Sequence, residues 1–368
     1  MFGFANFLLL ALFAAAVFDL IFALARGGGL RGALHGLWNT PHLLFGQQLA
    51  EWRLQLGRIL FAAGLAAYEI SVVFCNSMVR QNWAWVQGVM SPVLEWLAFL
   101  CFGAKILFGT RYTWRELLAG GALYFIARWV YFNSQNIWWI GIVVAVLAAK
   151  DVPLRRPLQV YFASGCAAMA VVLALHFAGI VAPDLTSERM GALRGTYGYG
   201  HPNTFGGLVF GLVLAYALLR AQNVRWVDCL LVFAVGVFLL VGPASRSAAL
   251  CTLALAVGLV FCRLRTGHSV PRWWPGTCAG MVGLTAAVSY LLPLLVIKVG
   301  PWNNDIGPAW LAKLDSLLTC RISLTWMAYR LLDVKIAGQV FNWPTVDNSF
   351  AFALFQFCLL YTSPSPRD

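Results

Sequence analysis

Residues 158–182 read LQVYFASGCAAMAVVLALHFAGIVA and contain no aspartate, glutamate, lysine or arginine. A run of about 20 apolar residues is the length that crosses the hydrocarbon core of a bilayer as a helix. Lipid offers no partner to a free backbone N–H, so such a run is expected to be helical throughout. The stretch therefore predicts a membrane-spanning helix and assigns the chain to the helical membrane proteins.

The same pattern recurs along the 368 residues of the chain, which is 61% hydrophobic and only 11% charged. The sequence predicts an all-α, polytopic integral membrane protein with about 11 transmembrane helices, of which the last is incomplete. A long extracytoplasmic loop, residues 298–347, is expected before that last helix. The expected spans are residues 4–25, 59–78, 86–107, 117–133, 136–149, 158–182, 204–220, 227–243, 247–262, 274–297 and 348 onward.

The two ends of the chain are interpreted separately. Residues 4–25 follow no positively charged segment and precede no clear small-residue cleavage site, so we expect a transmembrane helix rather than a signal peptide. Residues 1–58 are then an N-terminal extension with one transmembrane helix, and residues 59–357 form one helical membrane domain. Residues 358–368, CLLYTSPSPRD, read as a translated sequencing adapter and are treated as a scar.

The basic residues are distributed unevenly between the two sides of the expected bundle. With the N-terminus outside, fifteen of them fall in inward connections, whereas the short outward connections hold only Arg80, Arg189, Arg194 and Arg246. An excess of lysine and arginine on the inner side is what membrane topology requires. The net charge of +12 is therefore attributed to topology, and its dispersal argues against nucleic-acid binding.

A polar loop punctuated by glycines interrupts the apolar sequence at residues 194–205, which read RGTYGYGHPNTF. The guanidinium of Arg194 suits the bidentate binding of phosphate oxygens, although snorkelling to lipid headgroups is the plainer interpretation. Asn203 precedes the next span, where it suits an N-cap and where free N–H groups attract anions. We expect Arg194 and Asn203 to bind a phosphate or pyrophosphate.

A second arginine is expected at a helix start. Pro243, Ala244 and Ser245 bring Arg246 to the beginning of an apolar helix, where a cation opposes the helix dipole. A bound anion removes that penalty. Ser245 and Arg246 are therefore predicted to contribute to the same anion site.

Four further residues are candidates for the chemistry or the binding. His201 is the only histidine of the outward connections and a candidate base, with a hydrogen-bonded loop residue as the simpler interpretation. Asp347, a second candidate base, and Asn348 precede the last span, where capping also explains them. Arg321 lies on the polar face of a helix expected over residues 309–332, either on the membrane surface or folded over the bundle.

Other polar residues are given no part in a site. Asp19, Glu69 and Glu95 lie within or near three early spans and are interpreted as local polar contacts. The nine cysteines show no Cys-x-x-Cys pair and no metal-ligand spacing. The outward connections show no acidic cluster, so we expect a metal-independent reaction without a cofactor.

The polar motifs occur in an order that resembles the bacterial O-antigen polymerase/ligase family, which includes O-antigen and capsular polysaccharide repeat-unit polymerases. The resemblance covers residues 59–357, so that residues 59–357 look like a polysaccharide polymerase domain. It rests on Arg194–Gly206, on Ser245-Arg246-Ser247, on Leu317-Leu318 with Arg321, and on Val346–Ser349. Each motif is weak alone, and their order at the outward ends of a polytopic chain gives the match its specificity.

The resemblance implies a multi-pass protein of the bacterial cytoplasmic membrane that polymerises glycans carried on undecaprenyl pyrophosphate. Arg194, Arg246 and Arg321 would then bind the donor pyrophosphate. The implied partners are an undecaprenyl-pyrophosphate-linked oligosaccharide, membrane lipid and other polysaccharide-assembly proteins. Two alternatives stay open, a ligase that uses the same donor and a flippase or transporter of lipid-linked glycans. A transporter is expected to carry ionisable residues near the membrane midplane in repeated halves, whereas the charges here collect at one face.

Overall fold

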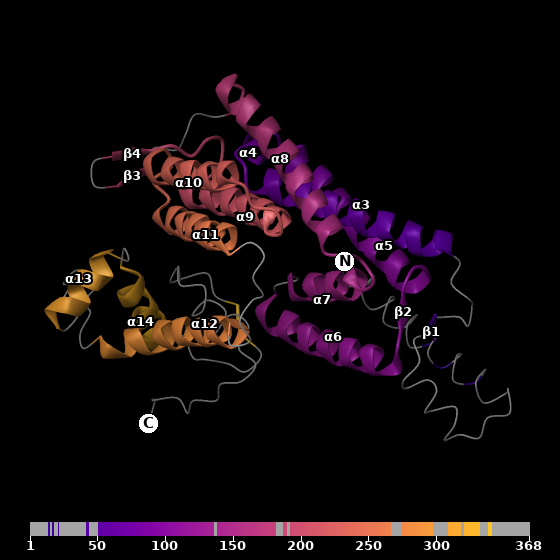
Figure 1. Cartoon of the computed structure of the whole chain (residues 1–368). Coiled ribbons are helices and arrows are strands. Elements are labelled where there is room, and N and C mark those ends of the chain that lie inside the picture. Colours follow the sequence, from indigo (N-terminus) through magenta and orange to yellow (C-terminus); the bar gives the residue numbers. More distant parts are fainter. Residues whose placement is uncertain are drawn as a thin grey trace. The chain divides into compact units, whose positions relative to one another are not determined.

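The computed structural model describes residues 42–43, 51–135, 138–181, 187–189, 192–265, 274–296, 308–317, 320–331 and 338–340, with Ala14, Val17 and Ile21 as single residues. Helices dominate the described residues, as expected for an all-α protein (Figure 1). The helices are α3 (Glu51–Cys75), α4 (Val79–Asn82), η1 (Val86–Met90), α5 (Ser91–Phe108), α6 (Trp114–Ser134), α7 (Trp138–Ala149), α8 (Arg155–Phe177), α9 (Pro202–Arg220), α10 (Trp226–Val241), α11 (Arg246–Leu264), α12 (Trp274–Leu291), η2 (Leu292–Leu295), α13 (Ala309–Leu317) and α14 (Arg321–Leu331). The described strands form two short antiparallel pairs, β1 (His42–Leu43) with β2 (Arg111–Tyr112) and β3 (Ser187–Arg189) with β4 (Ala192–Arg194).

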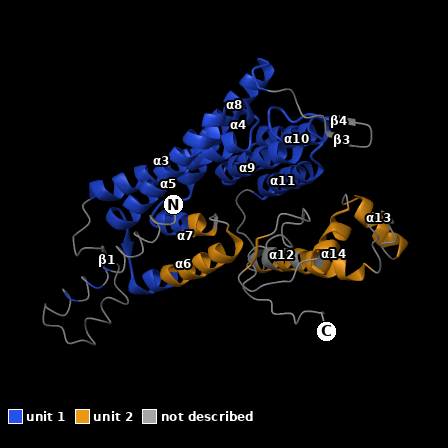
Figure 2. Cartoon of the chain, turned by 180° about the vertical axis from the view of Figure 1, so that it is seen from behind, with its two compact units in different colours: residues 1–119, 144–268 blue, residues 120–143, 269–368 orange. Residues whose placement is uncertain are grey.

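The chain divides into two compact units (Figure 2). Unit 1 comprises residues 1–119 and 144–268, and unit 2 comprises residues 120–143 and 269–368. The division passes through α6 and α7. Helix α3 begins at Glu51, so it also runs through residue 58, where the N-terminal extension was expected to end.

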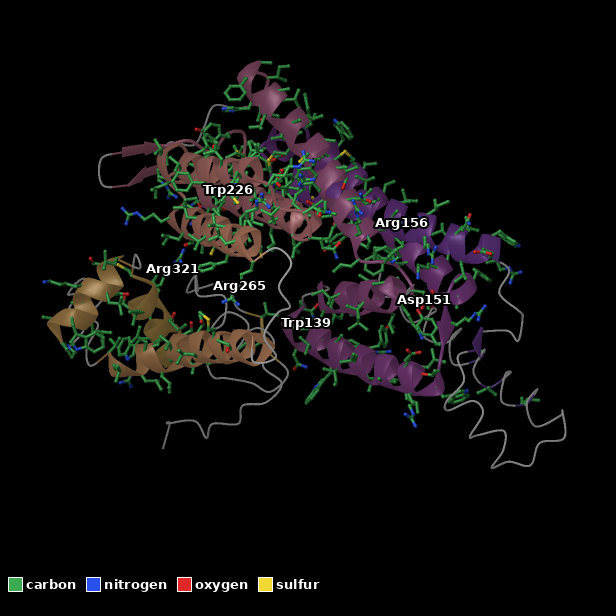
Figure 3. All side chains as sticks on the ribbon, in the orientation of Figure 1. Trp139, Asp151, Arg156, Trp226, Arg265 and Arg321 are labelled. Carbon is green, nitrogen blue, oxygen red and sulfur yellow. The ribbon has the colours of Figure 1, made fainter. Side chains whose placement is uncertain are left out.

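Five described helices are long and apolar enough to cross a membrane, namely Glu51–Cys75, Val86–Phe108, Arg155–Phe177, Pro202–Arg220 and Arg246–Leu264. The expected count of 11 is not supported. Trp139–Ala149, Trp226–Val241 and Gly283–Leu295 are apolar but shorter, and the first and last expected spans lie outside the described helices. Large apolar side chains point outward, among them Trp226, which is 56% exposed (Figure 3). A lipid-facing surface has this character.

Small residues let the long helices of unit 1 pack closely. A Cβ on Gly57 of α3 would lie 3.0 Å from the carbonyl oxygen of Gly109, just beyond α5. Further along the same contact, a Cβ on Gly64 would lie 2.9 Å from the Phe102 ring. In a membrane, the hydrophobic effect does not drive helices together, and small residues such as glycine let them associate through close van der Waals packing. Helix α3 therefore packs against α5 on one side and against α8 on another.

Helices α9, α10 and α11 follow one another as antiparallel neighbours in unit 1 (Figure 1). The turn between α9 and α10 is held by Asp228, whose carboxylate accepts from the Arg225 backbone N–H (2.7 Å) and from Arg220 Nε (3.2 Å). The hydroxyl of Tyr216 donates to the same carboxylate at 2.5 Å. Because the helices alternate in direction, the starts of α9 and α11 lie at the same end of unit 1 as the end of α10.

We call this end the loop end; the C-terminal ends of α3 and α8 also lie there. The backbone N–H of Met78, after α3, donates to the Gly198 carbonyl (2.8 Å). The Asn82 side chain donates to the carbonyl of Ile180, after α8 (2.9 Å). The loop end comprises residues 76–90, 178–181, 192–204 and 242–248 among the described ones, and none of these residues is acidic.

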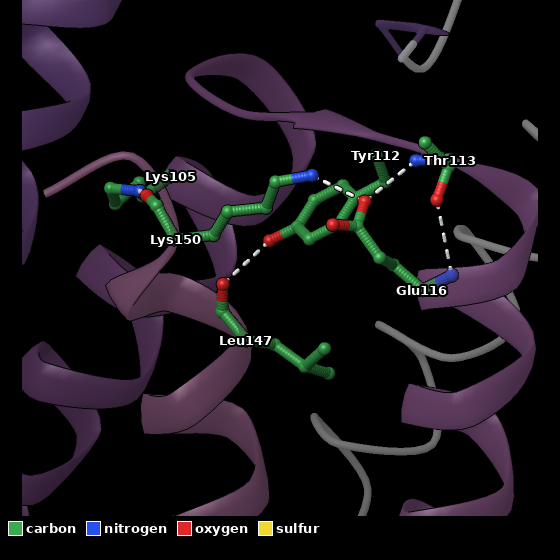
Figure 4. A network of polar contacts seen from close by, with 6 residues as sticks. All are labelled: Lys105, Tyr112, Thr113, Glu116, Leu147 and Lys150. Carbon is green, nitrogen blue, oxygen red and sulfur yellow. Dashed lines mark hydrogen bonds and ion pairs between the residues drawn. The ribbon is translucent and has the colours of Figure 1, made fainter. Parts of the chain in front are cut away.

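The opposite, basic end of unit 1 is stabilised by a polar network (Figure 4). Thr113 and Glu116 form a capping box at the start of α6, with Thr113 N donating to Glu116 Oε2 (2.8 Å) and Glu116 N to Thr113 Oγ1 (3.3 Å). Lys150 forms an ion pair with Glu116, and the buried amine of Lys105 donates to the Lys150 carbonyl (2.7 Å). The described basic residues at this end are Arg53, Arg58, Lys105, Arg111, Arg115, Lys150, Arg155, Arg156, Arg220, Arg225, Arg263 and Arg265.

In unit 2, the prediction of a single helix over residues 309–332 is wrong, because α13 and α14 are separate helices. Cys320, between them, has a φ of +62°. The fully buried Asp315 of α13 accepts from the backbone N–H groups of Ile322 (2.8 Å) and Ser323 (3.2 Å). It thereby satisfies the first turn of α14, as an N-cap does. Local capping thus overrides the continuous helical periodicity.

Candidate functional site

The loop between β4 and α9 lies within the core of the loop end. Tyr197 and Gly198 have positive φ angles of 51° and 81°, and a Cβ on Gly198 would lie 3.0 Å from the Cβ of His176. The Tyr197 ring packs against Phe205 (5.0 Å between centroids) and Phe238 of α10 (5.6 Å). These contacts fix the backbone on either side of the loop's polar residues.

Arg194 is buried, at 6% exposure, and holds two chain segments together. Its Nε donates to the Pro243 carbonyl (3.3 Å), and one terminal nitrogen donates to the Ala244 carbonyl (3.2 Å) and to Asn203 Oδ1 (3.0 Å). The guanidinium therefore joins the segment before α11 to the first turn of α9. A planar fork with several donors suits this bridging.

The start of α9 differs from the expectation. Helix α9 begins at Pro202, and the N-cap is His201, whose Nδ1 accepts from the Asn203 backbone N–H at 3.1 Å. The prediction that Asn203 is the N-cap is therefore wrong. Its amide oxygen instead accepts from Arg194 and, at 3.4 Å, from the Ser245 hydroxyl.

Arg246 stands at a helix start, as the sequence predicts. Helix α11 begins at Arg246, an exposed residue, and the buried Ser245 precedes it as N-cap. Ala244 has a φ of +49°, which turns the chain sharply between α10 and α11. The starts of α9 and α11 are therefore neighbours, joined through Asn203, Ser245 and Arg194.

Gly206 makes this close approach possible. A Cβ at residue 206 would lie 2.5 Å from Ser245 Oγ and 3.1 Å from the Cβ of Ala248. This packing role of Gly206 is not predicted by the sequence. The signal available was its position one turn into a helix that follows a polar loop, which a single sequence does not distinguish from other glycines.

The arrangement suits an anion. Each helix start carries the positive end of a helix dipole. At α9 the first N–H groups are already engaged, because Asn203 N donates to His201 Nδ1 and Thr204 N donates to the His201 carbonyl. Two such starts side by side, with an exposed arginine on one, add partial and full positive charge at one place. The ranges that make up the loop end contain no acidic residue, but β3, which pairs with β4, carries Glu188 and Arg189 beside them.

The remaining candidates belong to parts of the chain whose position relative to this site is not described. Arg321 is the first residue of α14 (Figure 3), and α14 belongs to unit 2 (Figure 2). Asp347 and Asn348 lie outside the described residues. The described site therefore consists of Arg194, His201, Asn203, Ser245 and Arg246.

Comparison of the chain with protein-family models, with curated proteins and with solved structures finds no match.

Proposed function

We propose that this chain is a membrane glycan polymerase of the bacterial cytoplasmic membrane. It transfers an oligosaccharide from undecaprenyl pyrophosphate to a second lipid-linked repeat unit at the extracytoplasmic face. The observation that carries the proposal is the joined pair of helix starts, α9 and α11, with exposed Arg246 on one and buried Arg194 bracing both. The order of motifs that resembles the O-antigen polymerase/ligase family supports the same reaction.

The leaving group explains why such a site is useful. In the transfer, a hydroxyl oxygen of the acceptor sugar bonds to the anomeric carbon of the donor, and the bond from that carbon to pyrophosphate breaks. The bonding electrons leave with the phosphate oxygen, so negative charge develops there. The positive ends of two helix dipoles and a guanidinium would stabilise that charge.

Arg246 and Arg194 have different roles in this proposal. The exposed Arg246 side chain binds the pyrophosphate. The buried guanidinium of Arg194 already donates hydrogen bonds to the carbonyls of Pro243 and Ala244 and to the side chain of Asn203. Arg194 therefore acts as a positioning residue that holds the helix starts in register. Arg321 of unit 2 remains a second candidate for the pyrophosphate.

The hydroxyl proton needs an acceptor, and the geometry constrains His201. Nδ1 of His201 accepts the Asn203 N–H, so the neutral ring carries its proton on Nε2. Taking up a second proton at Nδ1 would break the cap of α9. Asp347 is therefore the preferred base in this proposal, with Asn348 beside it to orient the acceptor.

Two other functions remain alternatives. A ligase would use the same pyrophosphate site and differ only in the acceptor. A flippase or transporter of lipid-linked glycans would move the same donor without breaking it.

Expression of the full-length protein in a strain that lacks its own repeat-unit polymerase separates these functions. We expect a ladder of glycan lengths on a gel. A single repeat unit attached to acceptor would favour the ligase. Transport of intact lipid-linked glycan without any change in length would favour the flippase, and either result would contradict the polymerase.

A further inference from the structure

Tyr197, in the loop between β4 and α9, has a backbone conformation that its side chain does not favour. Its φ is +51°, in the left-handed region that glycine adopts readily and that an aromatic residue rarely adopts. Residues held in such conformations cost free energy and cluster at binding and catalytic sites. The strain at Tyr197 therefore asks for a reason beyond the course of the loop.

The packing of the ring accounts for only part of this side chain. The ring centroid lies 5.0 Å from that of Phe205, 5.6 Å from that of Phe238 and 6.5 Å from that of His176. These contacts hold the ring in place and offset the strain. A phenylalanine would make the same ring contacts. The hydroxyl group is thus the part of Tyr197 that the packing does not explain.

The hydroxyl group occupies a space that a glycine leaves open. A Cβ on Gly242, the residue after α10, would lie 2.6 Å from the Tyr197 hydroxyl oxygen. The same Cβ would lie 3.1 Å from the Phe238 ring, so the hydroxyl oxygen is the closer of these two contacts. Gly242 has a φ of −73°, which does not require a glycine. The absent side chain at residue 242 therefore makes room for the hydroxyl group.

The hydroxyl group of Tyr197 has no hydrogen-bond partner among the described residues. Tyrosine hydroxyl groups usually find such a partner when they are buried. Tyr197 is half-buried, whereas Tyr199, two residues further on, is fully buried, and its hydroxyl oxygen is also without a described partner. Of the two, Tyr197 is the one that a ligand can reach. Its hydroxyl group can both donate and accept a hydrogen bond.

This hydroxyl group lies beside the anion site, at a helix end of the opposite polarity. Gly242 precedes Pro243 and Ala244, whose carbonyls accept hydrogen bonds from Arg194. The end of α10 carries the negative end of a helix dipole, and the last carbonyls of a helix are acceptors. A phosphate is disfavoured there, whereas the hydroxyl groups of a sugar can donate to such acceptors. The starts of α9 and α11 hence suit the pyrophosphate, and the end of α10 suits a sugar attached to it.

We propose that Tyr197 binds the first sugar of the donor, the one bonded to the pyrophosphate, by a hydrogen bond between its phenolic hydroxyl group and a hydroxyl group of the sugar. This inference rests on the proposed function and names the part of the donor that is recognised beside the anion site. Because the aromatic contacts already fix the ring, little side-chain freedom is lost on binding. Tyr197 is a binding residue and forms no bond with the reacting atoms.

Binding of two probes to the purified full-length protein in detergent tests the proposal. The first probe is undecaprenyl pyrophosphate, which carries no sugar. The second is the lipid-linked repeat unit that accumulates in the polymerase-deficient strain. We expect the wild type to bind the second probe more tightly. Tyr197→Phe should weaken binding of the second probe by about two- to tenfold, as loss of one neutral hydrogen bond does, and leave binding of the first unchanged.

Tyr199→Phe is the matched control, because it removes a hydroxyl group from the same loop at a fully buried position. Its affinity for both probes should equal that of the wild type. Arg246→Ala should weaken the binding of both probes, since both carry the pyrophosphate. The unfolding temperature of Tyr197→Phe should equal that of the wild type, because the lost hydroxyl group has no partner among the described residues.

Equal affinity of the wild type for the two probes would overturn the proposal, and this result requires no variant to fold. Wild-type affinities in Tyr197→Phe, or equal weakening of both probes, would overturn it as well. If Arg246→Ala weakens both probes while Tyr197→Phe binds like the wild type, only the sugar contact is wrong. If the expected dependence on Tyr197 is found but no glycan ladder forms, only the polymerase is wrong.

Discussion

Arg246 and Arg194 are both arginines at the loop end, yet their surroundings give them different tasks. Arg246 is exposed at the first residue of α11, whereas Arg194 is buried and bridges two segments. Arg246→Ala should therefore lower polymer formation by about a hundredfold or more, as for removal of a donor that stabilises transition-state charge. Arg246→Lys keeps the charge but loses the fork and should recover little.

Arg156→Ala is the matched control for this prediction. Arg156 is also an exposed arginine in the first turn of a long apolar helix, but it lies at the basic end (Figure 3). Glycan ladders at matched expression should be normal for Arg156→Ala. Normal ladders for Arg246→Ala would remove the pyrophosphate site from the mechanism.

Arg194 should affect stability as well as activity. Arg194→Ala leaves the Pro243 and Ala244 carbonyls and the Asn203 amide oxygen without a donor that they now have. Losing one partner of buried hydrogen bonds costs about 1–3 kcal/mol. We expect a lower unfolding temperature in detergent for Arg194→Ala and an unchanged one for Arg246→Ala. Equal stability of the two variants would contradict the bracing role.

The sequence identified these candidate residues but did not predict the contacts between them. Loop composition placed Arg194, Asn203 and Arg246 at the loop end. It assigned the cap to Asn203 because asparagine is a better cap than histidine. The Asn203 side chain instead accepts a hydrogen bond from the buried guanidinium of Arg194, and His201 is the N-cap. A tertiary contact overrides a local preference there.

At the scale of the elements, the packing of α9 on α11 depends on one glycine. Gly206→Ala places a Cβ 2.5 Å from Ser245 Oγ and should cost about 1–3 kcal/mol, as overpacking does. A Cβ on the neighbouring Gly207 would meet nothing within 4 Å, so Gly207→Ala should be neutral or slightly stabilising. Thermal unfolding of both variants in detergent measures the difference. Similar unfolding temperatures would mean that the two helix starts are not held together.

The start of α6 provides a pH-dependent prediction at the basic end. Burial opposes ionisation, but hydrogen bonds from Lys150 and Thr113 hold the pKa of the Glu116 carboxyl group below its ordinary value of 4.5. A lowered pKa adds stability that is present above about pH 4.5 and is lost as the pH falls toward the folded-state value. The side chain of Glu116 is 43% exposed, so screening limits the contribution to roughly 0.5 kcal/mol.

Unfolding temperatures measured from about pH 6 down to about pH 3 should fall less steeply for Glu116→Gln than for the wild type. Glu51→Gln removes an exposed glutamate from the first turn of α3 and should keep the wild-type slope. Parallel curves for the wild type and Glu116→Gln would show that the capping box does not contribute.

At the scale of the whole molecule, the sequence predicted helices better than it predicted spans. Hydropathy finds apolar segments, and the five long helices coincide with expected ones. It does not fix helix length: α10 has 16 residues, about 24 Å, which is short of the hydrocarbon thickness. An average hydropathy also hides single charged residues within a helix. Helix α6, for example, carries Arg115, Glu116 and Arg128. The division into two units depends on long-range packing, which periodicity does not reveal.

The two ends of unit 1 give the last prediction. Twelve described basic residues lie at one end, whereas the loop end holds Arg80, Arg194 and Arg246, with Glu188 and Arg189 on the adjoining strand β3. By the positive-inside rule, the loop end faces outward. A cysteine placed at exposed Gly200 should react with an impermeant thiol reagent added to intact cells, in a chain whose native cysteines are replaced by alanine. A cysteine at exposed Gln222, between α9 and α10, should react only after permeabilisation. The reverse pattern would turn the anion site toward the cytoplasm, where a reaction on outward-facing lipid-linked glycan has no substrate.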